Sequence, residues 1–246
     1  MSPSSARGYL VHLYTTSAML FVVLAIQWIL EGRYELALVA MAITVMIDAT
    51  DGALARKYRV SETAPRIDGP LLDNVVDYVS YVVLPIVFML HVGMLLQPVT
   101  AFATLVAFSS AYGFSRTSAK LSDEGFFVGF PSYWNVVVFY AYILDLSPLF
   151  TTVLVVALSL LVFTDVRFLY VTRMRRGRLL HLVLGGAWGV AALAALLVEP
   201  GELRSALAYG SLGYVAFYTV HSLVLDRRAR QRRRRERSLR PADLVD

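Results

Sequence analysis

The sequence predicts an all-α integral membrane protein, a helical bundle with about eight transmembrane helices. Of its 246 residues, 57% are hydrophobic, and the mean hydropathy of +0.60 is well above that of an ordinary soluble domain. The apolar residues also gather in long stretches, and a transmembrane helix needs about 20 mainly apolar residues. The chain has no cysteine, which excludes disulfides and thiolate chemistry.

Eight stretches are apolar enough to be considered as membrane spans. They are residues 9–30, 36–55, 70–94, 98–117, 131–146, 149–171, 180–198 and 205–225, and the fifth is the shortest. No small-residue cleavage site follows the first stretch, so we expect it to remain a membrane helix rather than act as a signal peptide. The sequence therefore predicts a transmembrane domain over residues 1–225 and a basic tail over residues 226–246.

Basic residues are concentrated in every second connection between these stretches. They are Arg7, Arg56, Lys57, Arg59, Arg66, Arg116, Lys120, Arg173, Arg175, Arg176 and Arg178, followed by the arginines of the tail. Because Lys and Arg near span ends stay in the cytoplasm, both termini are predicted to be cytoplasmic. A basic segment beside a membrane gains about 1 kcal/mol per charge from anionic lipids. We therefore expect the tail to bind membrane lipids and no nucleic acid.

Four aspartates lie at the predicted cytoplasmic ends of the second and third spans. Asp48 and Asp51 are three residues apart, and Asp73 and Asp77 are four apart, so each pair shares one face of a helix. If the two helices are antiparallel neighbours, all four carboxylates meet in one pocket, where they require cations among them. An oxygen-only ligand set suits Mg²⁺ or Mn²⁺ rather than zinc. Two such ions would balance the four charges, and two-metal sites suit phosphoryl transfer.

Small residues and an arginine accompany the aspartates. Glycine inside a helix lowers helix stability by about 1 kcal/mol relative to alanine, so Gly52 calls for a reason. Together with Ala55 it leaves room for a ligand close to the helix. Arg56 offers a planar fork of donors to a phosphate, and Gly69 extends the stripe of the second aspartate pair. The alternative is that the acids are helix caps and loop charges. This fits Asp68, which precedes Gly-Pro, but it does not account for the complete set.

The aspartates, the small residues and the arginine together resemble the signature of the CDP-alcohol phosphotransferase family, and all eight positions are matched. The signature in this chain is Asp48-x2-Asp51-Gly52-x2-Ala55-Arg56, then Gly69-x3-Asp73-x3-Asp77. The spacer of twelve residues that follows Arg56 is longer than in most members. The spacer, IDGPLLDNVVDY (67–78) and GFPSYWNVVVFY (129–140) are similar to the bacterial branch that uses choline. The resemblance covers residues 8–225.

The resemblance implies that CDP-diacylglycerol and choline react to give phosphatidylcholine and CMP, in the inner membrane of a bacterium and at its cytoplasmic face. It implies two divalent ions, Mn²⁺ or Mg²⁺, and Asp77 as the general base. The implied metal ligands are Asp48, Asp51, Asp73 and Asp77. The residues expected beside the CDP group and the phosphates are Gly52, Ala55, Arg56, Gly69, Arg116 and Lys120. Members are often dimers, so a homodimer is a further expectation.

Aromatic residues near the same membrane face predict the choice of alcohol. Choline carries a quaternary ammonium without an N–H donor, and proteins hold such groups over aromatic faces, often beside a carboxylate. The choline-binding candidates are Tyr78, Tyr81, Tyr133, Trp134, Glu124, Asp165 and Asn74. The same aromatics equally fit an interfacial belt or ordinary packing.

Three other points stay open at this stage. Asp165 is predicted to lie inside the sixth span, where it has either a functional role or an arginine partner from another helix. Arg116 and Lys120 hold either the phosphates of the lipid or, in a serine-using relative, the carboxylate of serine. The alternative functions are a sister enzyme that uses serine, inositol or glycerol phosphate, and a cation transporter. The four histidines, including His12, are expected to be structural.

Overall fold

The computed structural model describes residues 3–116, 120–121, 125–174 and 177–238, and it leaves the side chains of 120–121 and 232–238 undescribed. The described part is mainly helical, with little strand. Together with its apolar helices, this confirms the prediction of an all-α membrane protein.

The helices and strands follow one another closely along the chain. In order they are α1 (Pro3–Thr16), α2 (Ala18–Leu30), α3 (Tyr34–Lys57), α4 (Val60–Thr63), α5 (Gly69–Tyr78), the π-helical turn η1 (Val79–Val83), α6 (Leu84–Val92), α7 (Val99–Ser115), β1 (Lys120–Leu121), β2 (Phe126–Val128), α8 (Trp134–Ile143), α9 (Pro148–Val162), β3 (Arg167–Leu169), the 3₁₀ turn η2 (Val171–Arg173), α10 (Arg178–Leu197) and α11 (Glu202–Ser238).

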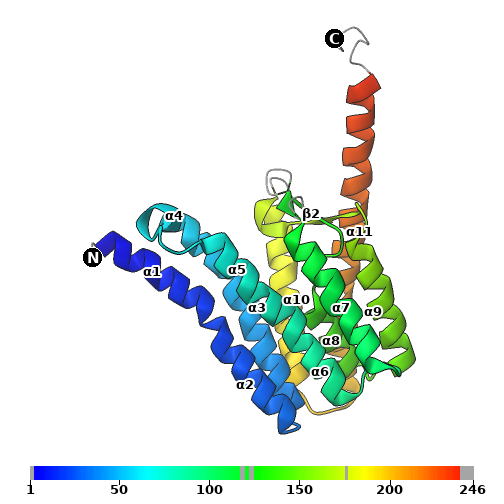
Figure 1. The fold of residues 1–246 in the computed structure, drawn as a ribbon. Coiled ribbons are helices and arrows are strands. Elements are labelled where there is room, and N and C mark those ends of the chain that lie inside the picture. Colours follow the sequence, from blue (N-terminus) through cyan, green and yellow to red (C-terminus); the bar gives the residue numbers. More distant parts are fainter. Residues whose placement is uncertain (1–2, 117–119, 122–124, 175–176, 239–246) are drawn as a thin grey trace.

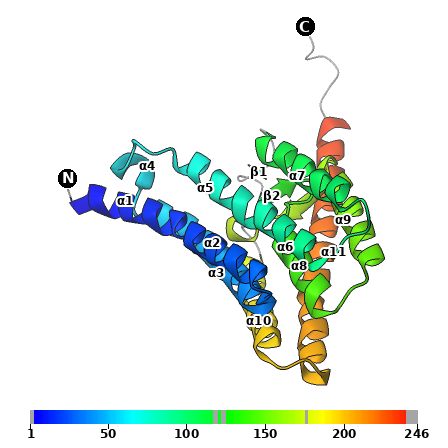
Figure 2. The same cartoon turned by 60° about the horizontal axis from the view of Figure 1, so that its bottom comes forward.

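Consecutive long helices pack against each other as antiparallel pairs. α2 packs on α3 and α10 packs on α11 in this way, whereas α7 packs in parallel on α9, from which α8 separates it along the chain (Figure 1). The turns of the α2–α3 and α10–α11 pairs lie at one end of the molecule. α4, β2 and the far end of α11 lie at the opposite end, and α11 projects well beyond the other helices (Figure 1). In Figure 2 the α10–α11 turn and the far end of α11 again lie at opposite ends. The loops that carry most of the charge therefore share one end.

Four helical stretches of the described chain are long and apolar enough to cross a membrane. They are Pro3–Leu30, Tyr34–Lys57, Gly69–Val92 and Arg178–Leu197. Val99–Ser115, Trp134–Ile143 and Pro148–Val162 are shorter apolar helices. α8 has 10 residues, which at 1.5 Å per residue is roughly half of the ~30 Å hydrocarbon thickness. The count of eight spans therefore stays a prediction. The predicted domain boundary at residue 225 falls inside α11, and it too stays a prediction.

The sixth predicted span is wrong after residue 162. α9 ends at Val162, whereas the sequence predicted a helix to residue 171. Thr164 ends the helix with a hydroxyl that donates to the carbonyl of Leu161. Asp165 and Val166 follow, and then β3 (Arg167–Leu169), which pairs antiparallel with β2. An apolar run rich in aromatic and β-branched residues is compatible with strand as well as helix, and hydropathy alone does not separate the two.

Candidate active site

The first two aspartates of the signature lie near the carboxyl end of α3. Asp51 is buried, with 5% of its surface exposed, and Asp48 is half-buried. The hydroxyl of Thr15 on α1 donates to Asp51 Oδ2 at 2.8 Å. Thr15 is itself 7% exposed, so this hydrogen bond lies in the protein interior. The N-terminal helix therefore fixes the orientation of one of the signature carboxylates.

The second aspartate pair lies on α5, whose start follows from local capping. The side chain of Asp68 accepts a hydrogen bond of 3.0 Å from the backbone N–H of Leu71, and Pro70 occupies the first turn. Asp73 and Asp77 follow on one face of this helix. η1 begins two residues after Asp77, and π-helical turns inside α-helices often mark functional sites.

Three carboxylates from the two helices meet. One oxygen from each of Asp48, Asp73 and Asp77 lies within 4.8 Å of the other two. Around an octahedral ion with oxygens at about 2.1 Å, opposite ligands are about 4.2 Å apart. Small side-chain movements would thus bring the three oxygens onto one hard divalent ion. Asp51 is not part of this group, although the charges of Asp73 and Asp48 act on it.

The glycines of the signature have specific neighbours. A Cβ at Gly52 would lie 3.4 Å from Nη1 of Arg56, one helical turn further along α3. The guanidinium therefore folds over the bare backbone of Gly52, although the Arg56 side chain as a whole is exposed. A Cβ at Gly69 would lie 3.3 Å from Cε1 of His12. Ala55 is half-buried on α3.

A row of tyrosines adjoins the acidic group. The hydroxyl of Tyr81, on η1, donates to Asp48 Oδ2 at 2.7 Å. Its ring lies 6.2 Å from that of Tyr133, the residue that precedes α8. Tyr133 is hydrogen-bonded to Tyr218 of α11, whose hydroxyl donates to the carbonyl of Leu169 at 2.9 Å. Sequence reasoning missed Tyr218 and Thr15, because no local pattern connects them to residues so far away along the chain.

Two other aromatic candidates have partners elsewhere. The hydroxyl of Tyr78 donates to the carbonyl of Ala107 at 3.0 Å. Trp134 is fully buried, and its Nε1 donates to Ser110 Oγ at 2.8 Å. Because a buried indole already has its single hydrogen bond, Trp134 is placed as a core residue. Asn74 is half-buried on α5 between the two aspartates of that helix.

Asp165 lies outside the helix in which it was predicted. It follows the end of α9, its side chain is 74% exposed, and it forms an ion pair with Arg116 at 2.5 Å. The hydrogen bond and positive charge of the Arg116 guanidinium lower the pKa of the Asp165 carboxyl below its usual value. The arginine partner from another helix, one of the two sequence-based alternatives, is therefore present. Glu124 and the side chain of Lys120 lie outside the described residues.

An acidic group at the end of apolar helices, with an arginine on the adjoining turn, is the arrangement expected of the family that the signature resembles. Residues 10–196 match the sequence model of the CDP-alcohol phosphatidyltransferases, and this chain belongs to that family. The match includes both halves of the signature, so the prediction made from those residues is confirmed.

Individual relatives lie within the branch that the spacer indicated. The phosphatidylcholine synthase of Legionella pneumophila is 40% identical over 222 residues, which cover 86% of this chain and 85% of the relative. The phosphatidylcholine synthase of Pseudomonas aeruginosa is 32% identical over 205 residues, covering 82% and 86%. That of Agrobacterium fabrum is 34% identical over 194 residues, covering 78% and 80%.

Proposed function

We propose that this protein is a phosphatidylcholine synthase of the bacterial inner membrane, which transfers the phosphatidyl group of CDP-diacylglycerol to choline and releases CMP. The observation that carries the proposal is the convergence of Asp48, Asp73 and Asp77 at the charged end of apolar helices. The names of the relatives support the choice of alcohol. We place the acidic group at the cytoplasmic face, because the connections at that end hold most of the basic residues.

The acidic group would hold Mn²⁺ or Mg²⁺. Asp48, Asp73 and Asp77 would provide the oxygens for one ion, and Asp51, oriented by Thr15, would provide a ligand for a second. A bound divalent ion offsets the negative charge of the pyrophosphate and of the departing CMP. Hard carboxylate oxygens are the donors that such ions prefer, so the residues present fit the expected ions.

Arg56 is placed to bind the phosphates of the CDP group. Its guanidinium lies over Gly52, on the same face of α3 as Asp48, and its planar donors match the oxygens of a phosphate. Because Gly52 has no side chain and Ala55 only a methyl group, a nucleotide can approach the backbone on that face of the helix. Arg116 is already paired with Asp165, and we assign it no phosphate.

The reaction that we propose is a direct displacement at the phosphorus of the phosphatidyl group. The hydroxyl oxygen of choline forms a bond to this phosphorus, the bond to the CMP phosphate breaks, and CMP leaves with the electron pair. The carboxylate of Asp77 accepts the hydroxyl proton. No covalent enzyme intermediate forms, so a chiral phosphorus is predicted to show inversion of configuration, and retention would contradict the scheme.

Choline is expected to bind beside Tyr81 and Tyr133. Their rings are 6.2 Å apart, and Tyr81 is hydrogen-bonded to Asp48. A quaternary ammonium is attracted to aromatic faces, and the adjoining carboxylates add a favourable charge. Tyr218 holds Tyr133 in place from α11. Trp134 is not included, because its ring lies in the core.

A panel of alcohols tests the proposed function. The purified protein is incubated with CDP-diacylglycerol and Mn²⁺, together with labelled choline, serine, inositol or glycerol phosphate. We expect labelled lipid with choline and little with the others. Product with serine or inositol, and none with choline, would assign the protein to a sister activity of the same family.

A further inference from the structure

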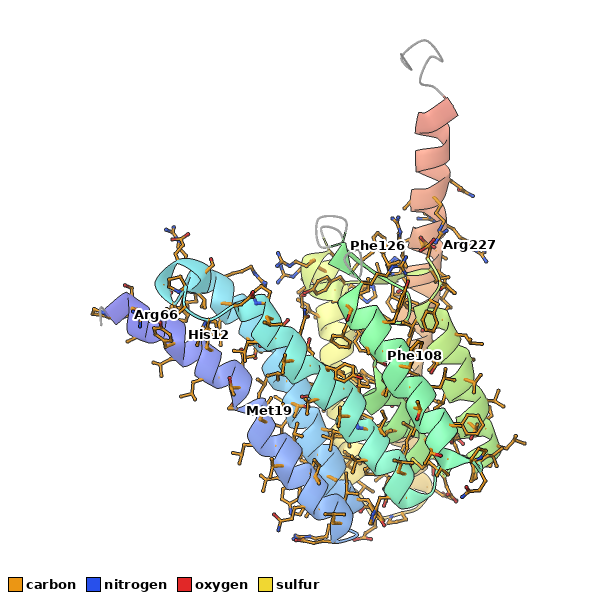
Figure 3. The ribbon with its side chains drawn as sticks, viewed as in Figure 1. His12, Met19, Arg66, Phe108, Phe126 and Arg227 are labelled. Atoms are coloured by element: carbon orange, nitrogen blue, oxygen red, sulfur yellow. The ribbon has the colours of Figure 1, made fainter. Side chains whose placement is uncertain are left out.

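One face of α1 contacts three different parts of the acidic region. Gly8, His12 and Thr15 are spaced by four and three residues and share this face. A Cβ at Gly8 would lie 2.5 Å from Oγ1 of Thr63, so α1 packs directly on α4 at this point. Thr15 donates to Asp51. His12 lies between these two contacts, where α1 passes below α4 and the start of α5 (Figure 3).

The side chain of His12 is buried but incompletely paired. It is 6% exposed, and its Nε2 has no hydrogen-bond partner within the described part of the chain. Cε1, the carbon bonded to Nε2, lies 3.3 Å from the position of a Cβ on Gly69. Buried polar atoms are nearly always paired in folded proteins, so an unpaired ring nitrogen beside a functional motif indicates a missing partner.

We infer that Nε2 of His12 forms a hydrogen bond with the cytidine nucleotide of CDP-diacylglycerol. The inference rests on the proposed function. Gly69, which the His12 ring approaches, and Asp51, which Thr15 contacts on the same face of α1, both belong to the signature. The hydrocarbon chains of the substrate and the quaternary ammonium of choline cannot pair with Nε2; the ester carbonyls of the lipid and the hydroxyl of choline can, so the experiment uses CMP, which contains neither. The nucleotide offers phosphate oxygens, ribose hydroxyls and the edge of the base.

The inference gives Gly69 a second role. Its missing side chain leaves room for the imidazole ring, which could not remain in place against a Cβ without shifting by a few tenths of an ångström. His12 thus joins α1 to the site through the ligand, as Thr15 does through Asp51.

Two substitutions of similar size separate hydrogen bonding from packing. His12→Gln keeps a polar group near the position of Nε2, whereas His12→Met fills the space without one. Binding of CMP to the purified full-length protein is measured by calorimetry with Mn²⁺ present, and thermal unfolding is measured in parallel. We expect His12→Met to weaken CMP binding by about five- to ten-fold, and His12→Gln to stay within about three-fold of the wild type.

Titration with a second ligand, cytidine, identifies the part of the nucleotide that pairs with His12. If cytidine shows the same loss as CMP, the nucleoside is the partner; if only CMP shows it, the phosphate is. Equal CMP affinity in the wild type and His12→Met would overturn the inference. The inference would also be overturned if both variants lost the same CMP affinity in proportion to a drop in melting temperature, because that result would assign His12 a packing role. A wild type that uses serine instead of choline would refute the proposed function, while the CMP comparison would still decide the role of His12.

Discussion

Replacing Thr15 with valine should weaken metal binding at the acidic site. The Thr15 hydroxyl donates to Asp51 Oδ2 at 2.8 Å, and both side chains are buried. Valine has nearly the same shape, so the substitution removes the donor and little else. A hydrogen bond to a charged group contributes about 1.5–3 kcal/mol, and losing the partner that orients a metal ligand typically costs about 10–100-fold in metal affinity. We therefore expect the Kd for Mn²⁺ to rise by at least about ten-fold.

Thr16→Val is the matched control for this experiment. Thr16 is the next residue on α1, but its hydroxyl donates at 2.8 Å to the carbonyl of His12 in the same helix. Free Mn²⁺ is measured by electron paramagnetic resonance during titration of the purified protein, and thermal unfolding reports on stability. Thr16→Val should bind Mn²⁺ like the wild type. If Thr15→Val does so too, Asp51 is not a metal ligand that depends on Thr15, and the reasoning fails.

Three further substitutions test other parts of the site and fold. Tyr81→Phe removes the hydroxyl that donates to Asp48 and should lower kcat by roughly ten-fold. Its control, Tyr78→Phe, loses a hydrogen bond to a backbone carbonyl and should change kcat by less than about two-fold. Equal effects of the two substitutions on kcat would contradict this prediction. Tyr218→Phe should raise the KM for choline by about three- to five-fold and leave that for CDP-diacylglycerol unchanged, with Tyr214→Phe as the α11 control. Gly129→Ala should lower the free energy of unfolding by more than about 2 kcal/mol. The backbone φ at this position is +81°, and the new Cβ would lie 2.3 Å from the carbonyl oxygen of Val162, the last residue of α9. A variant that melts at the same temperature as the wild type would show that this contact is wrong.

The sequence predicted the meeting of the two aspartate pairs for a sound physical reason. Spacings of three and four residues place each pair on one helix face, and the two helices are held near each other by α1, on which both α3 and α5 pack. The structure brings Asp48 together with Asp73 and Asp77, whereas Asp51, which was expected in the same pocket, lies outside this group and accepts a hydrogen bond from Thr15. The N-cap at Asp68 was predictable too, because Gly-Pro at a helix start is a local signal.

The contacts that could not be predicted join distant parts of the chain. Thr15 reaches Asp51 across 36 positions, and Tyr218 lies on the last helix. Nothing in the local pattern of either residue specifies a partner. The end of α9 was missed for a different reason, because the predicted span was extended across Asp165 and Arg167 to the apolar residues of β3. Trp134 was a choline-binding candidate with ordinary packing as one alternative; its indole donates to the hydroxyl of a buried serine, and the ring lies in the core.

The most direct test of the account is transfer of the phosphatidyl group by the wild type and by Asp73→Asn. The variant keeps the size of the side chain and removes its charge from the acidic group. With CDP-diacylglycerol, labelled choline and Mn²⁺, the wild type should release CMP and form labelled phosphatidylcholine in equal amounts. Asp73→Asn, with an unchanged melting temperature, should form neither product at a measurable rate. Labelled phosphatidylcholine from the variant at the wild-type rate would contradict the central claim that the acidic group carries the transfer to choline.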